Sequence, residues 1–190
     1  IGATIADVIG VKLGYDIGLL NRYTGEQYEG ETYKGSVVIS GETIAEVIKG
    51  DNLPNTPYNE TIDANECYLL PGVIDDHVHF RDPGLTHKAD IHTESMAAAA
   101  GGVTSYMDMP NTNPQTTTLE ALENKFKDAA TKSIVNYSFY FGATNNNADL
   151  LPLLDKQKVC GVKLFMGAST GNMLVDRIET LRNIFSNAGM

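Results

Sequence analysis

The sequence has 190 residues, of which 42% are hydrophobic and 20% charged, and its formal net charge is −10. This composition excludes a disordered or collagen-like chain, and no apolar run is long enough for a membrane helix. The acidic charge argues against nucleic acid as a partner. Cys67 and Cys160 lie far apart and the first 20 residues resemble no targeting segment, which predicts a cytoplasmic protein with reduced thiols.

The first 69 residues predict a small β-rich domain. Two β-type stretches, residues 36–39 and 43–48, flank Ser40-Gly41-Glu42, and this pattern is typical of a hairpin with a short turn. A loop with two prolines follows over residues 51–59, and residues 60–70 predict a further strand. These strands are too few to form a stable sheet alone.

From residue 70 to residue 190 the pattern alternates between strands and helices. Strands are predicted over residues 72–78, 104–109, 137–142 and 161–166, and helices over 88–100, 119–132, 150–157 and 178–185. The spacing of about 30 residues is that of a βα unit, and such units predict a parallel sheet covered by helices. Four units fit either an open α/β sheet or the first half of a (β/α)₈ barrel, and periodicity does not choose between them.

All four histidines fall between His77 and His92. His77 and His79 are two residues apart, so they project from one face at the carboxyl end of a strand, where parallel α/β enzymes carry their active sites. Two neutral imidazoles side by side suit zinc; the alternative is a chance pair on an exposed strand. His87 and His92 lie where a helix begins, and we predict that they are helix-surface or supporting residues.

Two charged residues near the histidine pair have more than one interpretation. Arg81 faces the same end of the sheet, where its guanidinium can bind a carboxylate through two hydrogen bonds or pair locally with Asp82 or Asp90. Lys163 lies in a strongly apolar strand, and a buried ammonium must be neutralised, paired or extended to solvent.

Four stretches of the sequence carry a family resemblance. Residues 77–84 (HVHFRDPG) resemble the metal-binding signature of cyclic amidohydrolases and, more narrowly, of dihydroorotases. Residues 101–104 (GGVT) and 109–114 (MPNTNP) resemble the next two dihydroorotase signatures at the expected separation, and residues 161–167 (GVKLFMG) resemble the strand with the bridging lysine of the superfamily. The likeness runs from residue 17 to residue 190 and is clearest from 69 to 175.

The resemblance implies a fold and an activity. The fold is the N-terminal part of a (β/α)₈ metal-dependent hydrolase barrel, with about four βα units over residues 70–190, after a partial β-sandwich over residues 1–69. The activity is the reversible, zinc-dependent hydrolysis of the cyclic amide of dihydroorotate to N-carbamoyl-aspartate in pyrimidine biosynthesis. The expected partner is therefore this small molecule, with no nucleic acid and no membrane; a homodimer of the complete protein stays open.

The resemblance also assigns site residues. It implies two divalent metal ions, zinc by expectation, held by His77, His79 and a carboxylated Lys163 that bridges them. It places Arg81 and Asn111 on the ring carboxylate of the substrate, although Asn111 is also a good turn residue between two prolines. Asp108 is a candidate hydrogen-bond partner for a ligand imidazole.

The remaining ligands and the catalytic aspartate of the family come from later strands, so the expected general acid/base lies beyond residue 190. We therefore expect the 190-residue chain alone to be inactive and poorly folded. Three alternatives stay open: an allantoinase or hydantoinase, a non-catalytic dihydroorotase-like partner of aspartate transcarbamoylase, and a metal-binding fragment without turnover. Arg81 argues against a hydantoinase, and the Met-Pro-Asn-Thr stretch at 109–112 argues against an allantoinase.

Overall fold

The computed structural model describes residues 34–41, 43–50, 57–64, 67–167 and 173–187, and the backbone of residues 19–20 and 27–28. The chain divides into two compact units, Ile1–Pro71 and Gly72–Met190. Within the described residues, every helix is too short or too polar to cross a membrane.

The first unit contains two antiparallel strand pairs. Strands β1 (Leu19–Leu20) and β2 (Gln27–Tyr28) form one pair, and β3 (Gly35–Ser40) and β4 (Thr43–Lys49) form the other. The β3–β4 pair confirms the predicted hairpin, and Gly41 in its turn has a φ of 61°, a conformation that glycine adopts at little cost.

The strand predicted over residues 60–70 is wrong for the described part. Residues 60–64 and 67–70 form no strand, and the side chain of Ile62 is 67% exposed. A strand needs a neighbour for its backbone hydrogen bonds, and the described part of this segment has none to pair with. Of the loop predicted over residues 51–59, residues 51–56 lie outside the described residues.

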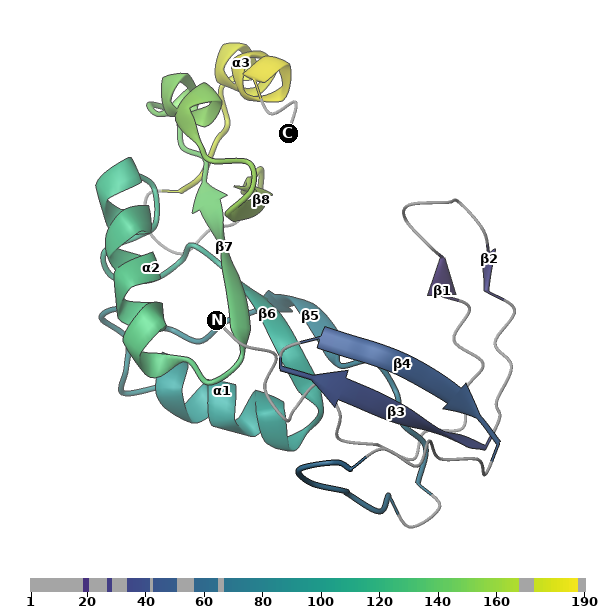
Figure 1. The fold of residues 1–190 in the computed structure, drawn as a ribbon. Coiled ribbons are helices and arrows are strands. Elements are labelled where there is room, and N and C mark those ends of the chain that lie inside the picture. The colour runs from purple at the N-terminus through teal and green to yellow at the C-terminus, as the bar shows by residue number, and fades with distance from the viewer. Residues whose placement is uncertain are drawn as a thin grey trace. The chain divides into compact units, whose positions relative to one another are not determined.

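The second unit is built on a parallel four-stranded sheet (Figure 1). Its strands are β5 (Val73–Val78), β6 (Val103–Asp108), β7 (Asn136–Gly142) and β8 (Val159–Lys163), and they lie side by side in chain order. Helix α1 (Ile91–Ala100) follows β5, α2 (Leu119–Lys132) follows β6, the 3₁₀ helix η2 (Ala148–Leu153) follows β7, and α3 (Ile178–Asn187) follows β8. These are four successive βα units.

One face of the sheet carries the hydrophobic core. Strand residues Tyr106, Phe139, Phe141 and Val159 form one buried cluster with helix residues Ile91, Leu122, Ala129, Leu151 and Ile184. Helices therefore cover this face, as in one wall of a barrel. On the opposite face, which we call the inner face, Ser105, Met107 and Tyr140 are only half-buried.

Local sequence explains where the helices begin. The side chain of Asp90 accepts a hydrogen bond from the backbone N–H of Thr93 at 2.9 Å, and Thr118 does the same for Ala121 at 3.1 Å. These are N-caps, so α1 begins at Ile91, three residues later than predicted, and α2 coincides with its predicted range. The helix predicted over 150–157 is instead the earlier 3₁₀ helix η2, which contains Pro152.

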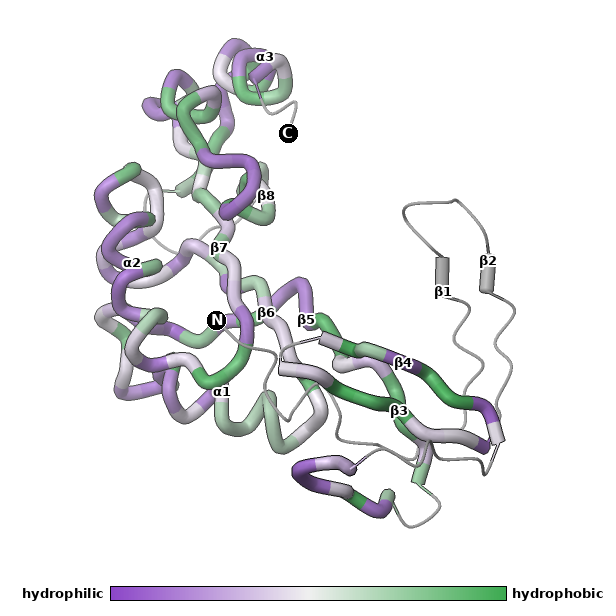
Figure 2. Tube along the Cα trace, in the orientation of Figure 1, coloured by the Kyte–Doolittle hydropathy of each residue, from purple (hydrophilic) through white to green (hydrophobic). Residues whose placement is uncertain are grey.

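Helix α2 is amphipathic, and one position breaks its pattern. Hydrophilic residues make up much of the helix (Figure 2), while Leu122, Phe126 and Ala129 pack toward the sheet. Lys125 occupies the same stripe, three residues after Leu122, and is only 1% exposed. A lysine on the buried face of a helix requires a partner inside the protein.

Candidate functional site

The two histidines that end the first strand of the sheet lie together. His77 belongs to β5, and His79 is the first residue after that strand. Their ring centroids are 5.5 Å apart, and both residues are exposed. Val78 and Phe80, which alternate with them, pack toward the core instead. The strand pleat therefore presents both imidazoles on the inner face, as the spacing predicts.

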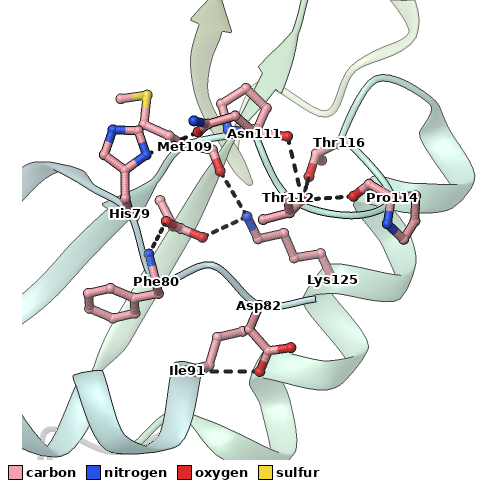
Figure 3. Close-up of polar contacts among 12 residues, drawn as sticks. His79, Phe80, Asp82, Ile91, Met109, Asn111, Thr112, Pro114, Thr116 and Lys125 are labelled. Atoms are coloured by element: carbon pink, nitrogen blue, oxygen red, sulfur yellow. Dashed lines mark hydrogen bonds and ion pairs between the residues drawn. The ribbon is translucent and has the colours of Figure 1, made fainter. Parts of the chain in front are cut away.

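Asn111, from the loop after β6, contacts the second histidine. Its Oδ1 lies 3.0 Å from Nδ1 of His79 (Figure 3). An amide oxygen only accepts, so Nδ1 of His79 donates its hydrogen and Nε2 keeps a free lone pair. Burial and the nearby charge of Arg81 lower the pKa of His79, against the opposing effect of the hydrogen bond to Asn111. A lowered pKa favours the neutral ring, which is the form a metal ligand needs.

Arg81 has a left-handed backbone, with a φ of 64°. This conformation is unfavourable for a residue with a side chain, and such residues concentrate at functional sites. Neither local partner considered above is engaged with it in the part of the chain that the structure describes: Asp82 contacts Lys132 Nζ at 3.0 Å, and Asp90 caps α1. The interpretation of Arg81 as a local ion pair is therefore wrong.

The loops after β5 and β6 dock onto each other. The backbone N–H of Asn113 donates to the carbonyl of Pro83 at 3.0 Å. Gly84 lies so close to this loop that a Cβ atom there would collide with the carbonyl of Asn113, and its φ is 82°. The glycine is required on both counts. The two loops thus hold Arg81 and Asn111 beside the histidine pair.

A buried ion pair lies beneath these loops, and sequence reasoning missed it. Nζ of Lys125 lies 2.7 Å from Oδ2 of Asp108 and 3.1 Å from the carbonyl oxygen of Met109 (Figure 3). The other oxygen, Oδ1 of Asp108, accepts from the backbone N–H of Phe80 at 2.9 Å. The expectation that Asp108 bonds a ligand imidazole is wrong, because its Oδ1 accepts from the N–H of Phe80 and its Oδ2 lies against the ammonium of Lys125 instead. The signal that could have found it is Lys125 on the apolar stripe of α2.

Lys163 ends β8 at the same edge of the sheet, three strands from the histidines. It is half-buried, and its Nζ lies 5.1 Å from the centroid of the Phe165 ring. Within the described residues no carboxylate pairs with it, so the salt-bridge interpretation of Lys163 is wrong there. Its amine lies over an aromatic ring instead.

A β-bulge sets the direction in which Lys163 points. Val159 pairs with Phe139 and both are buried under the helices, but the next pairing joins Gly161 to Tyr140 and leaves Cys160 extra. Val159 and Lys163 would otherwise share a face, because residues four apart on a regular strand do. The extra residue shifts the alternation, so Lys163 follows Gly161 onto the inner face.

The donor atoms present fit part of a metal centre. His77 and His79 offer two neighbouring imidazoles, and Asn111 fixes the tautomer of one of them. No group of three or more His, Cys, Asp or Glu side chains that could hold a metal occurs in the described residues. His87 and His92 are exposed, and His92 lies on α1 with Nδ1 3.1 Å from the carbonyl of Lys132, as predicted for a helix-surface residue.

Comparison with known proteins gives this arrangement a class. The chain aligns with the L-hydantoinase (dihydropyrimidinase) of Arthrobacter aurescens with a TM-score of 0.73 and 29% identity, over 80% of this chain and 34% of that one. A D-hydantoinase structure is also similar, with a TM-score of 0.66 and 28% identity, over 83% of this chain and 35% of that one. The predicted fold class is confirmed: the four strands form the curled first half of an amidohydrolase (β/α)₈ barrel.

Within that class, residues 67–151 match the family described as Dihydro-orotase-like. The dihydroorotase of Halobacterium salinarum is 43% identical over 116 residues, which are 60% of this chain and 27% of that protein. The allantoinase of Deinococcus radiodurans is 39% identical over 142 residues, 74% of this chain and 31% of that protein. The chain thus spans 31% of the length of the allantoinase and 27% of the length of the dihydroorotase.

Proposed function

We propose that the protein carrying this chain is a dihydroorotase, which hydrolyses the cyclic amide of dihydroorotate to N-carbamoyl-aspartate and catalyses the reverse cyclisation in pyrimidine biosynthesis. The observation that carries the proposal is the cluster of His77, His79, Arg81 and Asn111 at one edge of the sheet. All four lie inside the matched segment, residues 67–151.

Metal binding is part of the proposal. His77 and His79 would ligate one of two divalent ions, zinc by preference, and Lys163 would bridge the pair after its neutral amine takes up carbon dioxide and releases a proton to form a carbamate. When bound, the ions supply Lewis acidity to the reaction. The half-buried position of Lys163, beside an aromatic ring and on the inner face, supports this role.

Substrate binding falls to Arg81 and Asn111. The guanidinium of Arg81 would hold the ring carboxylate through two hydrogen bonds. Asn111 directs its oxygen to His79, so only its amide N–H groups are left to donate to the same carboxylate. We place the general acid/base outside residues 1–190, and the domain boundary at residue 70, near the division after Pro71. A cytoplasmic location and a homodimer complete the proposal.

A second candidate is an allantoinase or hydantoinase. It is favoured by the 39% identity to the allantoinase over 142 residues and by the likeness to hydantoinase structures. Allantoin and hydantoin carry no ring carboxylate, so Arg81 would have no carboxylate to bind in either substrate. The third candidate is a non-catalytic partner of aspartate transcarbamoylase.

The test is an assay of the full-length protein with zinc and bicarbonate, in which dihydroorotate, allantoin and hydantoin are offered separately. We expect turnover of dihydroorotate that is lost in His77→Ala and kept in His87→Ala, because His87 is exposed and outside the cluster. Turnover of allantoin alone would favour the second candidate. Zinc binding without any turnover would favour the non-catalytic partner.

A further inference from the structure

The buried pair of Lys125 and Asp108 has more contacts than an ion pair needs. Lys125 is 1% exposed and Asp108 is fully buried. Besides the carboxylate, Nζ of Lys125 contacts the carbonyl of Met109, and it lies 4.7 Å from the centroid of the Phe139 ring. A carboxylate, a carbonyl and an aromatic ring therefore surround the ammonium, and a buried charge requires such partners.

These contacts join the two segments that carry the site. On one side, Oδ1 of Asp108 holds the backbone N–H of Phe80, the residue directly after His79. On the other side, Nζ of Lys125 holds the carbonyl of Met109, two residues before Asn111. Together with the bond from the backbone N–H of Met109 to the carbonyl of Val78 at 3.0 Å, Asp108 thus joins the end of β5 to β6, and Lys125 holds Asp108 and the start of the next loop. The contact between His79 and Asn111 lies directly above this pair (Figure 3).

The pair is not needed to fill the core. Burying two charges costs desolvation energy, and an apolar pair of similar volume is often as stable. What an apolar pair cannot do is hold two backbone groups at fixed positions. We propose that the Lys125–Asp108 pair is a positioning device, which keeps the imidazole of His79 in its Nδ1–H form with Nε2 free for a metal.

This inference depends on the proposed function in one respect, which is that the ligand of His79 is a divalent metal ion. Its main readout needs neither metal nor substrate. The ring tautomer of His79 is visible in long-range ¹H–¹⁵N spectra of the full-length protein, in which the His79 signals are assigned by their loss in His79→Ala. We expect Nδ1–H in the unmodified protein and loss of that single form in Asn111→Ala. Observation of the Nε2–H form in the unmodified protein would overturn the proposal.

The decisive variant is Lys125→Met combined with Asp108→Asn, which leaves no unpaired buried charge and keeps an oxygen for the N–H of Phe80. We expect a mixture of His79 tautomers and a zinc affinity, measured by chelator competition, that is about 10- to 100-fold weaker. The matched control is Lys127→Met on the same helix, whose pair with Glu123 is exposed; it should change neither.

An unchanged tautomer and unchanged zinc affinity in the double variant would overturn the inference. If the double variant does not fold, Asp108→Asn alone in the full-length protein is the second variant, and an unchanged tautomer and zinc affinity there would overturn the inference. Zinc bound through His77 and His79, with the expected tautomer but no hydrolysis of dihydroorotate, would refute the proposed function and support this inference.

Discussion

The two ends of the site are held by different means. At the carboxyl ends of β5 and β6, a polar network fixes His79 and Asn111, with a buried ion pair beneath them. At the end of β8, Lys163 depends on strand geometry, because a bulge at Cys160 turns it to the inner face and its amine lies over the ring of Phe165. The orientation and tautomer of His79 are therefore fixed by hydrogen bonds before any ligand binds. The direction of Lys163 is fixed by the strand, but its amine stays available for reaction.

The difference suits the proposed chemistry. A histidine ligand must be neutral, in one tautomer and correctly oriented, and hydrogen bonds provide all three. A lysine that reacts with carbon dioxide must keep its amine accessible, and a strong ion pair would block that reaction. Substitutions at either end of the site test this difference.

The largest effect is expected at the histidine end. Lys125→Met leaves the carboxylate of Asp108 buried without its partner, so the free energy of unfolding should fall by about 3–5 kcal/mol. Adding Asp108→Asn removes the stranded charge and should restore most of the loss. Urea denaturation of the two variants and of Lys127→Met measures this. Equal stability of the single and double variants would contradict the described coupling.

A smaller effect is expected at the lysine end. A Cβ atom on Gly161 would lie 2.9 Å from Cε1 of Tyr140, whose hydroxyl donates to the carbonyl of Asp76 at 3.0 Å. Gly161→Ala should therefore push the Tyr140 ring aside and destabilise the protein by about 1–3 kcal/mol. Gly167→Ala is the control, because a Cβ atom added there would have nothing within 4 Å of it. Thermal denaturation that shows no difference between the two would refute this account of the close packing.

The smallest effect has the opposite sign. Arg81→Gly removes a side chain from a left-handed backbone and should raise the free energy of unfolding by up to about 1 kcal/mol. Arg81→Ala loses the same guanidinium without this relief. Both variants should bind dihydroorotate more weakly, because both lack the guanidinium. The pair of variants therefore separates the effect of the backbone strain on stability from the effect of the guanidinium on substrate binding. Arg81→Gly that is less stable than Arg81→Ala would contradict the expected strain.

Much of the second unit could be predicted because its signals are local. The four apolar runs, the N-caps at Asp90 and Thr118 and the two-residue spacing of His77 and His79 act within a few residues. The failed strand over residues 60–70 had the right residue types, but strand formation depends on a distant partner. The shift from a predicted helix over 150–157 to η2 has a similar cause, since Pro152 allows a tight turn there but no long helix.

The sequence by itself determined the βα order, the histidine pair and the family resemblance, because each is written in contiguous residues. Only the tertiary structure decided that Asp108 pairs with Lys125 rather than with an imidazole, that Asn111 directs its oxygen to His79, and that Lys163 faces inward. Each of these depends on which groups meet across separate strands and helices. A buried charge takes whichever partner the packing brings within reach, and a one-residue bulge reverses the face of every residue after it.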